Sequence, residues 1–407
     1  MSTCRFCSSP LDFVFVDLGM SPLCETFLTS EELNQMEPFY PLKVFVCDQC
    51  WLVQLEEYVS PERIFGFYPY FSSYSTSWLR HAERYVETAI DRFDLRERNL
   101  VVELGSNDGY LLQYFVKANI PVLGIEPARN VAEEANRNGV PTRAVFFGEE
   151  TAEALRGEGI VADLIVGNNV LAQVPDLNSF VAGIKILLAE NGVVTIEFPH
   201  LMRLVEENQF DTIYHEHFSY FSLSAVSRVA SAHGLEVFDV EEMSSHGGSL
   251  RVFFQHVAGS RGREPRVQAL LETEEQKGLN GPAYYAAFSG RVEHLKRELL
   301  TFLIAAKEEG KTVAGYGAPG KGNTLLNYCG IRSDLIDFTV DRNPLKQGRY
   351  LPGTHIPIRS PDAIDSSRPD FVLILPWNLK QEIAEQLQGI RSWGGRFVVP
   401  IPQVEVF

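Results

Sequence analysis

Short apolar runs alternate with amphipathic segments through the middle of the chain. Runs rich in Val, Ile and Leu, typical of buried parallel strands, lie at 99–104, 122–125, 163–166 and 192–198. Apolar residues also recur at helical spacing, first at 79–95 and then from Tyr110 to Ala118. This alternation predicts an α/β domain with a largely parallel sheet at residues 76–260.

The same strand, glycine loop and helix pattern returns near the carboxyl end. The segment 312–324 contains an apolar strand followed by Gly315-Tyr316-Gly317-Ala318-Pro319-Gly320, and further strands are predicted within 334–341 and 371–378. A charged, glycine-containing stretch at 261–283 marks a boundary, and a long helix is predicted at 291–309. We therefore expect a second, smaller Rossmann-like unit at 261–407 and a separate module at 1–75.

The composition is that of an ordinary soluble protein. The 407 residues predict two or three domains, with 45% hydrophobic and 22% charged residues. The formal net charge of −17 argues against a nucleic-acid partner, because phosphate binding relies on a surplus of Lys and Arg. The chain contains no apolar run of about eighteen residues, so we expect no membrane span. The first residues lack an apolar signal core, so we expect a cytoplasmic protein. The oligomeric state stays open, and a monomer is compatible with the sequence.

Two Cys-x-x-Cys pairs, Cys4 with Cys7 and Cys47 with Cys50, indicate a metal site. Two residues between thiolates allow both to reach one ion in tetrahedral geometry. Four thiolates fill the coordination shell of Zn²⁺, so the predicted zinc is structural and not catalytic. The alternatives are unrelated free thiols, or a nucleic-acid-binding zinc module, which the acidic residues nearby disfavour.

The first strand of the central domain leads into the loop Glu103-Leu104-Gly105-Ser106-Asn107-Asp108-Gly109. Its glycines let the backbone approach a ligand, and Glu126, about twenty residues later, can accept hydrogen bonds from ribose hydroxyls. The loop is not G-x-G-x-x-G; its Glu-x-Gly-x-Asn-Asp-Gly form resembles the first motif of class I S-adenosylmethionine methyltransferases. Ligands of parallel sheets bind beyond the carboxyl ends of the strands, which adds Asn168 and Glu197 to the same rim. Phe146 and Phe147 either flank the adenine or belong to the core.

The segment Tyr214-His215-Glu216-His217 places four groups able to hold or move protons in consecutive positions. His217 is the predicted general base, because an unperturbed imidazole titrates near pH 6.5. Glu216 is expected to orient that imidazole, and Tyr214 to donate a hydrogen bond to a developing enolate oxygen. Asn169 and Gln173 would line the same pocket. Alternatively, this is a loop before a helix that starts near Ser222, and its polar groups cap one another.

Two further segments suggest ligand contacts. The second glycine loop, with Lys321 and Asn323 at the start of a helix, suits a diphosphate, and Arg251 is a second candidate phosphate partner. The alternative is a degenerate duplicated domain used only for packing. The aromatic and serine-rich run from Phe65 to Ser75 is either a lid over a ligand or the seal of a domain interface.

In combination, these motifs resemble a known family. The four-cysteine segment, Glu103 to Gly109, Tyr214 to His217, and Gly315 to Tyr328, in this order, are similar to the S-adenosylmethionine-dependent C-methyltransferases of nucleotide-linked 4-keto deoxysugars, the tetronitrose C-3'-methyltransferase type among them. The resemblance covers essentially the whole chain. It implies a zinc-binding domain (1–75), a class I methyltransferase domain (76–260) and a carboxyl-terminal Rossmann-like domain that binds the nucleotide sugar (261–407).

The resemblance also implies roles for individual residues. S-adenosylmethionine would lie against residues from the two loops, the strand ends and the aromatic run, namely Tyr68, Ser72, Glu103, Gly105, Asn107, Asp108, Glu126, Asn168 and Asn169. The sugar nucleotide would contact Gln173, Arg251, Lys321 and Asn323. His217 matches the family's proposed base, with Tyr214 and Glu216 as its companions. The family usually has histidine where this chain has Gln173, and glutamine cannot shuttle a proton.

We therefore expect methyl transfer from S-adenosylmethionine to a ring carbon next to the ketone of a dTDP-linked 4-keto-deoxysugar, by way of an enolate and most readily at C-3'. The rivals are an O- or N-methyltransferase, in which His217→Asn would matter little, and a non-catalytic zinc-containing binding protein. A redox enzyme with NAD in the carboxyl-terminal unit is disfavoured, because no acid at the second strand of that unit is cleanly placed to bind a ribose.

Overall fold

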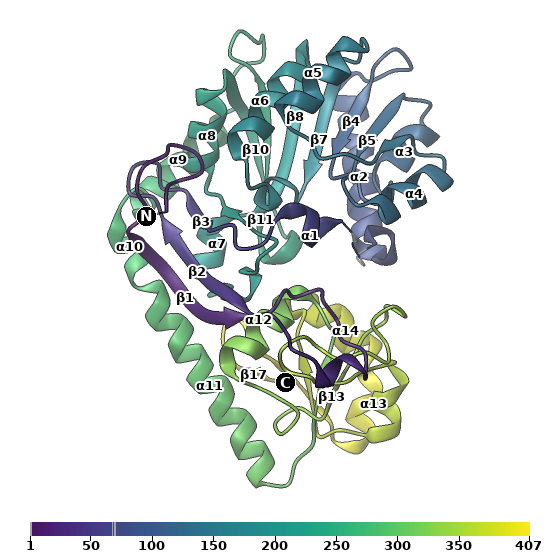
Figure 1. Ribbon diagram of the computed structural model, residues 1–407, viewed down its shortest axis with the longest axis vertical. Coiled ribbons are helices and arrows are strands. Elements are labelled where there is room, and N and C mark those ends of the chain that lie inside the picture. Colours follow the sequence, from purple (N-terminus) through teal and green to yellow (C-terminus); the bar gives the residue numbers. More distant parts are fainter. Residues whose placement is uncertain (1, 67, 69–70) are drawn as a thin grey trace.

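The structure, a computed structural model, describes residues 2–66, 68 and 71–407. Over these residues the chain forms three β-sheets, each belonging mainly to one of three successive units. Figure 1 shows the central unit above the carboxyl-terminal unit, with the amino-terminal strands running along both. The predicted α/β class with three units is confirmed. No helix of the described residues is long and apolar enough to span a bilayer.

The central sheet has seven strands in the order β10-β11-β8-β7-β4-β5-β6. Strands β4 to β8 are parallel, and the antiparallel pair β10 and β11 extends the sheet beside β8. Their bounds are β4 (Val101–Leu104), β5 (Val122–Ile125), β6 (Thr142–Arg143), β7 (Ala162–Asn168), β8 (Leu188–Pro199), β10 (Leu235–Met243) and β11 (Ser249–His256). Every residue of β4 is buried, as expected for a strand covered on both faces.

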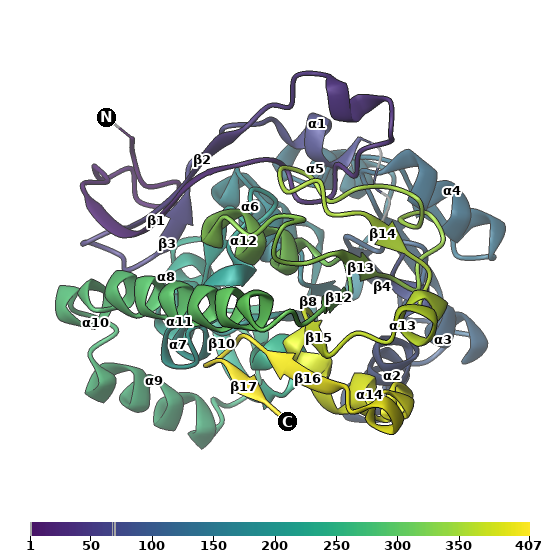
Figure 2. The ribbon, with the colours of Figure 1, turned by 90° about the horizontal axis from the view of Figure 1, so that it is seen from below.

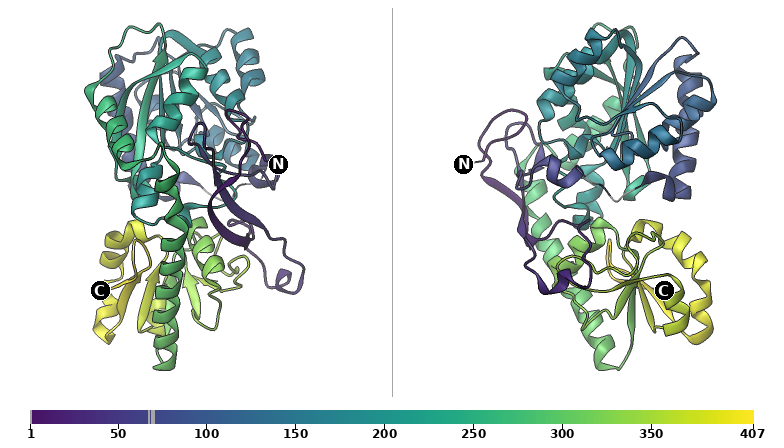
Figure 3. Two further views of the ribbon diagram at one scale, coloured as in Figure 1. Left: turned by 90° about the vertical axis from the view of Figure 1, so that its left-hand side faces the viewer. Right: turned by 45° about the vertical axis from the view of Figure 1, so that its right-hand side comes forward.

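Helices cover both faces of this sheet (Figure 3). They are α2 (Thr76–Phe93), α3 (Leu112–Lys117), α4 (Arg129–Arg137), α5 (Glu149–Gly157), α6 (Leu177–Leu187), α7 (Leu201–Glu206) and α8 (Leu223–Ala232). The Ser222 hydroxyl accepts a hydrogen bond from Ala225 N at 3.1 Å and so caps α8. The prediction of a helix start near Ser222 is confirmed.

The amino-terminal sheet contains β1 (Phe13–Ser21), β2 (Tyr40–Val46) and β3 (Val53–Leu55), and helix α1 (Pro61–Phe65) follows it. Its fourth strand is β9 (Ser219–Tyr220), which the central unit contributes. β9 pairs antiparallel with β3, with Tyr220 opposite Val53. The segment directly after His217 is therefore held by the sheet of the amino-terminal module.

The carboxyl-terminal sheet has the order β14-β13-β12-β15-β16-β17, parallel except for β17. Its strands are β12 (Val313–Tyr316), β13 (Phe338–Val340), β14 (Ile358–Arg359), β15 (Phe371–Ile374), β16 (Arg396–Val399) and β17 (Glu405–Val406). The helices of this region are α9 (Pro265–Lys277), α10 (Pro282–Ala286), α11 (Phe288–Glu308), α12 (Gly320–Cys329), α13 (Asp362–Ser367) and α14 (Lys380–Gln386). The predicted strand at 334–341 is shorter than expected, because only its last part pairs with β12.

One apolar core joins the amino-terminal hairpin to the carboxyl-terminal unit. Phe15 of β1 stacks on Phe288 of α11 with ring centroids 4.4 Å apart. Figure 2 shows α11 and α12 passing beneath the hairpin, which agrees with this contact. The amino-terminal module therefore packs against both Rossmann-like units and fixes the space between them.

Candidate active site

The four predicted zinc ligands converge. The Sγ atoms of Cys4, Cys7, Cys47 and Cys50 all lie within 4.8 Å of one another. Two pairs, Cys4 with Cys50 and Cys7 with Cys47, are 3.5 Å apart. A tetrahedral zinc with bonds of about 2.3 Å requires sulfurs about 3.8 Å apart, so this cluster fits Zn²⁺. Four sulfurs complete the shell, which makes the site structural.

The zinc cluster is connected to the central unit through Arg5. The Arg5 guanidinium donates to the carbonyl of Pro175 at 2.7 Å and to that of Leu55, and it lies over the Phe218 ring. Burial lowers the pKa of Arg5 to about 10. Gln54, whose side chain donates to Cys4 Sγ at 3.1 Å, also accepts from Arg5 N. The loop beside the acid/base cluster is thus tied to the metal site.

The first glycine loop is built as a cradle after β4. Gly105 and Gly109 have φ of 67° and 80°, and Asn107 between them has φ of 48°. A side chain on Gly109 would come within 2.8 Å of Val140, and one on Gly105 within 3.0 Å of Val170. Left-handed backbone and close packing together explain why glycine stands at both positions.

Glu126 lies at the end of β5, where a ribose acceptor is expected. Its carboxylate accepts hydrogen bonds from Asn107 N at 3.0 Å and Ala128 N at 2.9 Å. Burial raises its pKa to about 7, against the effect of these two amides. Burial also raises the pKa of Glu103 well above its usual value, while the Tyr110 hydroxyl acts in the opposite direction.

The aromatic run packs onto the same loop. Ser72 N donates to Asn107 Oδ1 at 2.8 Å, and Ser73 N donates to Asp108 Oδ2 at 3.2 Å. Tyr68 exchanges two backbone hydrogen bonds with the Asn130 side chain. Phe67, Pro69 and Tyr70 of this run lie outside the described residues. The described part of the run packs against the first glycine loop.

Asp108 Oδ1 and Asn169 Oδ1 are among the polar atoms at the rim that are buried without a hydrogen-bond partner within the described residues. Asn169 follows β7 with φ of 58°, and Asn168 Nδ2 lies 3.4 Å from the Tyr110 hydroxyl. Buried polar atoms normally have partners, so this rim fits a polar ligand such as S-adenosylmethionine. Phe147 packs edge-on against Phe180 and belongs to the core, whereas Phe146 is exposed.

In the acid/base segment, Tyr214 and His217 lie with ring centroids 4.0 Å apart. His217 Nδ1 is 2.9 Å from the carbonyl oxygen of Thr212, so Nδ1 carries the proton and Nε2 holds the free lone pair. Burial lowers the pKa of His217 to about 4 and raises that of Tyr214 well above its usual value. His215 points elsewhere, towards Pro41 and Tyr40 of the amino-terminal module.

The predicted role of Glu216 in orienting His217 is wrong. Thr212 supplies the orienting oxygen, while Glu216 Oε2 accepts a hydrogen bond from Cys24 Sγ at 3.0 Å. Burial, with the neighbouring charge of Glu25, raises the pKa of Glu216 to about 8. Adjacent residues in a loop point in different directions, and here the Glu216 side chain meets the amino-terminal module.

Lys321 and the residues around it lie on the carboxyl-terminal side of His217. Lys321 Nζ donates to Asn378 Oδ1 at 3.0 Å and lies 4.6 Å from the centroid of the Trp377 ring. Burial lowers its pKa, and Asp211 opposes that effect. Its charge is also one of the smaller causes that lower the pKa of His217, after burial. Asn323 instead donates to the carbonyl of Cys24 at 2.6 Å, with its Oδ1 buried and unpaired among the described residues.

Arg251 is not a phosphate partner. Its guanidinium is buried and donates to Glu197 Oε2 at 2.6 Å, and it lies over the Tyr85 ring. Glu197 also bonds His81 Nε2 at 2.8 Å, and these cationic and hydrogen-bonding neighbours hold the pKa of Glu197 near 2. The sequence predicts the strand on which Arg251 lies, but only the fold brings the buried Glu197 carboxylate beside it from the neighbouring strand.

Gln173 lies beside the acid/base loop. It ends a short 3-10 helix, Leu171–Gln173, and the Ala172 carbonyl of that helix accepts a hydrogen bond from Phe218 N at 2.7 Å.

In the carboxyl-terminal unit, Asp341 follows β13 and accepts a hydrogen bond from Ala318 N at 2.7 Å. The prediction that no acid is well placed at that strand is therefore wrong.

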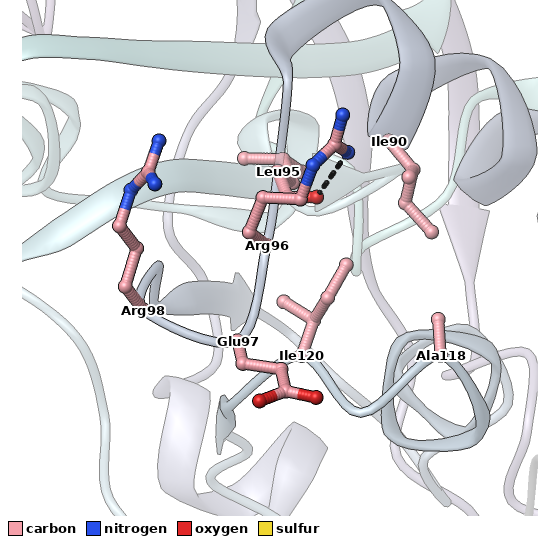
Figure 4. A pocket seen from close by; sticks show the side chains of 7 residues that line it. All are labelled: Ile90, Leu95, Arg96, Glu97, Arg98, Ala118 and Ile120. Carbon is pink, nitrogen blue, oxygen red and sulfur yellow. Dashed lines mark hydrogen bonds between the residues drawn. The ribbon is translucent and has the colours of Figure 1, made fainter.

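A surface depression of about 500 Å³ lies near the amino-terminal ends of β4 and β5, away from the glycine loop (Figure 4). It is lined by Ile90, Leu95, Arg96, Glu97, Arg98, Ala118 and Ile120. These residues adjoin the amino-terminal end of β4, whereas ligands of parallel sheets bind beyond the carboxyl ends. The depression has no part in the site described above.

Comparison with known proteins finds family models that match three successive parts of the chain. Family models match at residues 4–65 (zinc binding domain), 78–240 (methyltransferase domain) and 244–402 (C-methyltransferase C-terminal domain). The C-methyltransferase NovU of Streptomyces niveus is 39% identical over 403 residues, which cover 99% of this chain and 96% of that protein.

Solved structures give weaker likenesses. Magnesium protoporphyrin IX methyltransferase of Synechocystis with bound SAH is 14% identical, with a TM-score of 0.34, and the match covers 43% of this chain and 82% of that one. A methyltransferase of Clostridium acetobutylicum is 11% identical, with a TM-score of 0.35, covering 45% and 92%.

The match to NovU extends over nearly the full length of both proteins, and the three family models agree with it. The protein is an enzyme whose cofactors are S-adenosylmethionine and structural Zn²⁺. The chain belongs to the family of S-adenosylmethionine-dependent C-methyltransferases.

Proposed function

We propose that this C-methyltransferase methylates the ring carbon next to the ketone of a dTDP-linked 4-keto-deoxysugar, with C-3' as the position. The observation that carries the proposal is the pair formed by Tyr214 and His217, whose ring centroids lie 4.0 Å apart, beside the half-buried cation Lys321, which acts on the pKa of His217. Carbon next to a ketone must lose a proton before it can accept a methyl group. A base, a phenol and a positive charge are the groups such an enolisation needs.

His217 is the base of the proposed reaction. Because the Thr212 carbonyl holds the proton on Nδ1, Nε2 is the atom that receives the proton from the sugar carbon. A pKa of about 4 keeps the imidazole neutral, and so able to accept a proton, throughout the physiological range. Transfer of the methyl group then leaves the proton on His217, from which it returns to solvent.

Tyr214 and Lys321 stabilise the negative charge that develops on the ketone oxygen. A phenol whose pKa is raised stays protonated at neutral pH and can donate a hydrogen bond. Lys321 also suits an anionic substrate, because it brings a positive charge to this region. Burial lowers the pKa of Lys321, and the nearby Asp211 opposes that effect. Both groups thus favour an anionic acceptor such as a nucleotide sugar.

The cofactor residues are those of the first glycine loop and its surroundings. When bound, S-adenosylmethionine supplies an electrophilic methyl group on sulfonium. Glu126 would accept hydrogen bonds from ribose hydroxyls, and Asp108 and Asn169 offer unpaired oxygens to the polar end of the cofactor. Ser72 and its neighbours hold the loop in place and keep water away.

The test combines two measurements on a panel of dTDP-linked 4-keto-6-deoxysugars. Labelled S-adenosylmethionine reports transfer, and NMR locates the new methyl group. With S-adenosylhomocysteine in place of the methyl donor, exchange of the acidic C–H for deuterium from solvent reports enolisation alone. We expect both reactions, at one ring position, in the wild type.

His217→Asn should lower both rates by about 10²- to 10⁴-fold, with cofactor affinity unchanged. A variant that enolises as fast as the wild type would remove His217 from the role of base. A methyl group on oxygen or nitrogen, or no reaction with any sugar, would overturn the proposed substrate class.

A further inference from the structure

His246 lies on a strained loop that the reaction proposed above does not use. The loop joins β10 to β11 at the rim of the central sheet, on the side of the carboxyl-terminal unit (Figure 1). His246 has φ of 55° and ψ of 18°, and Gly247 and Gly248 follow with φ of 91° and 118°. Left-handed backbone at a non-glycine residue costs free energy and persists where the surrounding structure enforces it.

The carboxyl-terminal unit enforces this conformation from one side. A side chain at Gly247 would come within 2.5 Å of Trp377 of the carboxyl-terminal unit. One at Gly248 would come within 2.8 Å of Arg203, on α7 of the central unit. Trp377 is itself fixed, because its Nε1 donates to Asp211 Oδ2 at 2.7 Å. The loop therefore packs against Trp377, and Lys321 Nζ lies over the ring of the same tryptophan.

The central unit enforces it from the other side. Ser245 Oγ donates to Glu197 Oε1 at 2.7 Å, and Glu197 is anchored by Arg251 and His81. Trp78 stacks on His81, with centroids 4.8 Å apart, and meets the His246 ring edge-on at 5.1 Å. A buried ionic network thus exists beneath this loop and fixes the position of one imidazole.

That imidazole has no hydrogen-bond partner among the described residues. Its Nδ1 is buried without a hydrogen bond, and no described residue bonds its Nε2. The loop that holds it packs on Trp377, whose ring faces Lys321 Nζ and whose Nε1 bonds Asp211, in the segment that leads into His217. An imidazole fixed by packing and left without a hydrogen bond beside these groups is placed to bind a ligand.

We propose that His246 contacts the substrate, by a hydrogen bond to an oxygen of the acceptor sugar beside the reacting carbon. This inference rests on the proposed function and names a residue beyond the Tyr214 to His217 segment. Neutral imidazole can donate from one nitrogen and accept at the other, which suits a hydroxyl or a carbonyl. Trp78, which meets the His246 ring, also lies 6.0 Å from Tyr110, whose hydroxyl contacts Asn168 at the cofactor rim.

Three variants separate the contact from the strain. His246→Ala removes the contact, His246→Asn removes the imidazole while tolerating left-handed backbone, and His246→Gln offers a nitrogen at the reach of Nε2. His294→Gln, at an exposed histidine of α11, is the matched control. Each variant is tested for methyl transfer, for deuterium exchange with S-adenosylhomocysteine present, and for the dissociation constant of S-adenosylmethionine.

We expect His246→Ala and His246→Asn to lower kcat/KM for the sugar about 10- to 100-fold, mainly through KM, with partial recovery in His246→Gln. Exchange should fall in parallel, while cofactor affinity stays within about twofold. Variants that match the control in KM and exchange would overturn the inference, as would a parallel loss of cofactor affinity. If the wild type itself neither exchanges nor methylates any sugar, the proposed function fails first, and the inference fails with it.

Discussion

The two Rossmann-like units share one local design and use it differently. In each, a glycine loop follows the first strand and an acid ends the second. Glu126 accepts from Asn107 N and Ala128 N in the central unit, and Asp341 accepts from Ala318 N and Asn343 N in the carboxyl-terminal unit. The sequence pattern, and even the hydrogen bonds of the acid, therefore do not distinguish a cofactor site from its counterpart.

The difference lies in what covers each loop. Around the central loop, Asp108 Oδ1 and Asn169 Oδ1 are buried and unpaired within the described part of the chain. At the carboxyl-terminal loop, Lys346 Nζ donates to the Ala318 carbonyl at 2.9 Å and forms an ion pair with Glu25 at 3.2 Å. The first loop thus offers unpaired oxygens to a ligand, while Lys346 fastens the start of the second loop to the amino-terminal module.

Zinc removal should have the largest effect, because both units depend on the amino-terminal module. Structural zinc sites contribute about 10–16 kcal/mol of apparent binding free energy in small peptides, which is comparable to the stability of a whole domain. A chelator should unfold the module and release β9, so that methyl transfer is lost. Limited proteolysis and circular dichroism, before and after zinc is returned, measure this; full activity in the zinc-free protein would contradict it.

The second-largest effect should follow removal of one partner of the ion pair between Lys346 and Glu25, beside the second glycine loop. Lys346→Met leaves the Glu25 carboxylate buried without its cation, at a cost of about 3–5 kcal/mol. The double variant Glu25→Gln with Lys346→Met should recover most of that loss. Urea denaturation of the single and double variants tests the pair, and equal stability of Lys346→Met and wild type would show that the pair is not needed.

A matched pair of substitutions compares the two acids directly. Glu126→Gln should weaken S-adenosylmethionine binding about 10- to 100-fold, because a charge-assisted acceptor for the ribose is lost. Asp341→Asn should leave that affinity within about twofold. Isothermal titration calorimetry measures both, and the comparison breaks down if the two variants behave alike.

The smallest expected effect is a dependence on pH. Burial raises the pKa of Glu126 to about 7 from an ordinary value of 4.5, so the free enzyme holds this proton until the pH rises through 7. A ribose binds best to the ionised carboxylate, so cofactor affinity should rise a few-fold between pH 6 and 8. Glu126→Gln should flatten this profile; an unchanged slope in that variant would assign the titration to another group.

The raised pKa of Glu126 also affects the stability of the fold, which should decrease as the pH rises, whereas cofactor affinity increases. In the unfolded chain Glu126 loses its proton near pH 4.5, whereas the folded chain retains it up to about pH 7. The stability contribution of this group is therefore fully present below pH 4.5 and is lost as the pH rises through 7. Cofactor affinity and the stability of the free enzyme thus respond to pH in opposite directions.

Local sequence was sufficient to predict several elements of this protein. The two-residue spacing within each cysteine pair predicts the zinc ligands. One apolar run predicts the bounds of β5, and one serine predicts the start of α8. These features are decided by short-range geometry, so a pattern a few residues long contains the necessary information.

Only the tertiary structure decided what the reactive side chains face. Glu216 meets Cys24, which is 192 residues away in the chain, and Arg251 meets Glu197 on the neighbouring strand. The His246 loop and Lys321 come from different units, and both pack against Trp377, which in turn bonds Asp211. Such partners depend on how three separately patterned units dock, and burial then sets the pKa values, so no local motif could predict them.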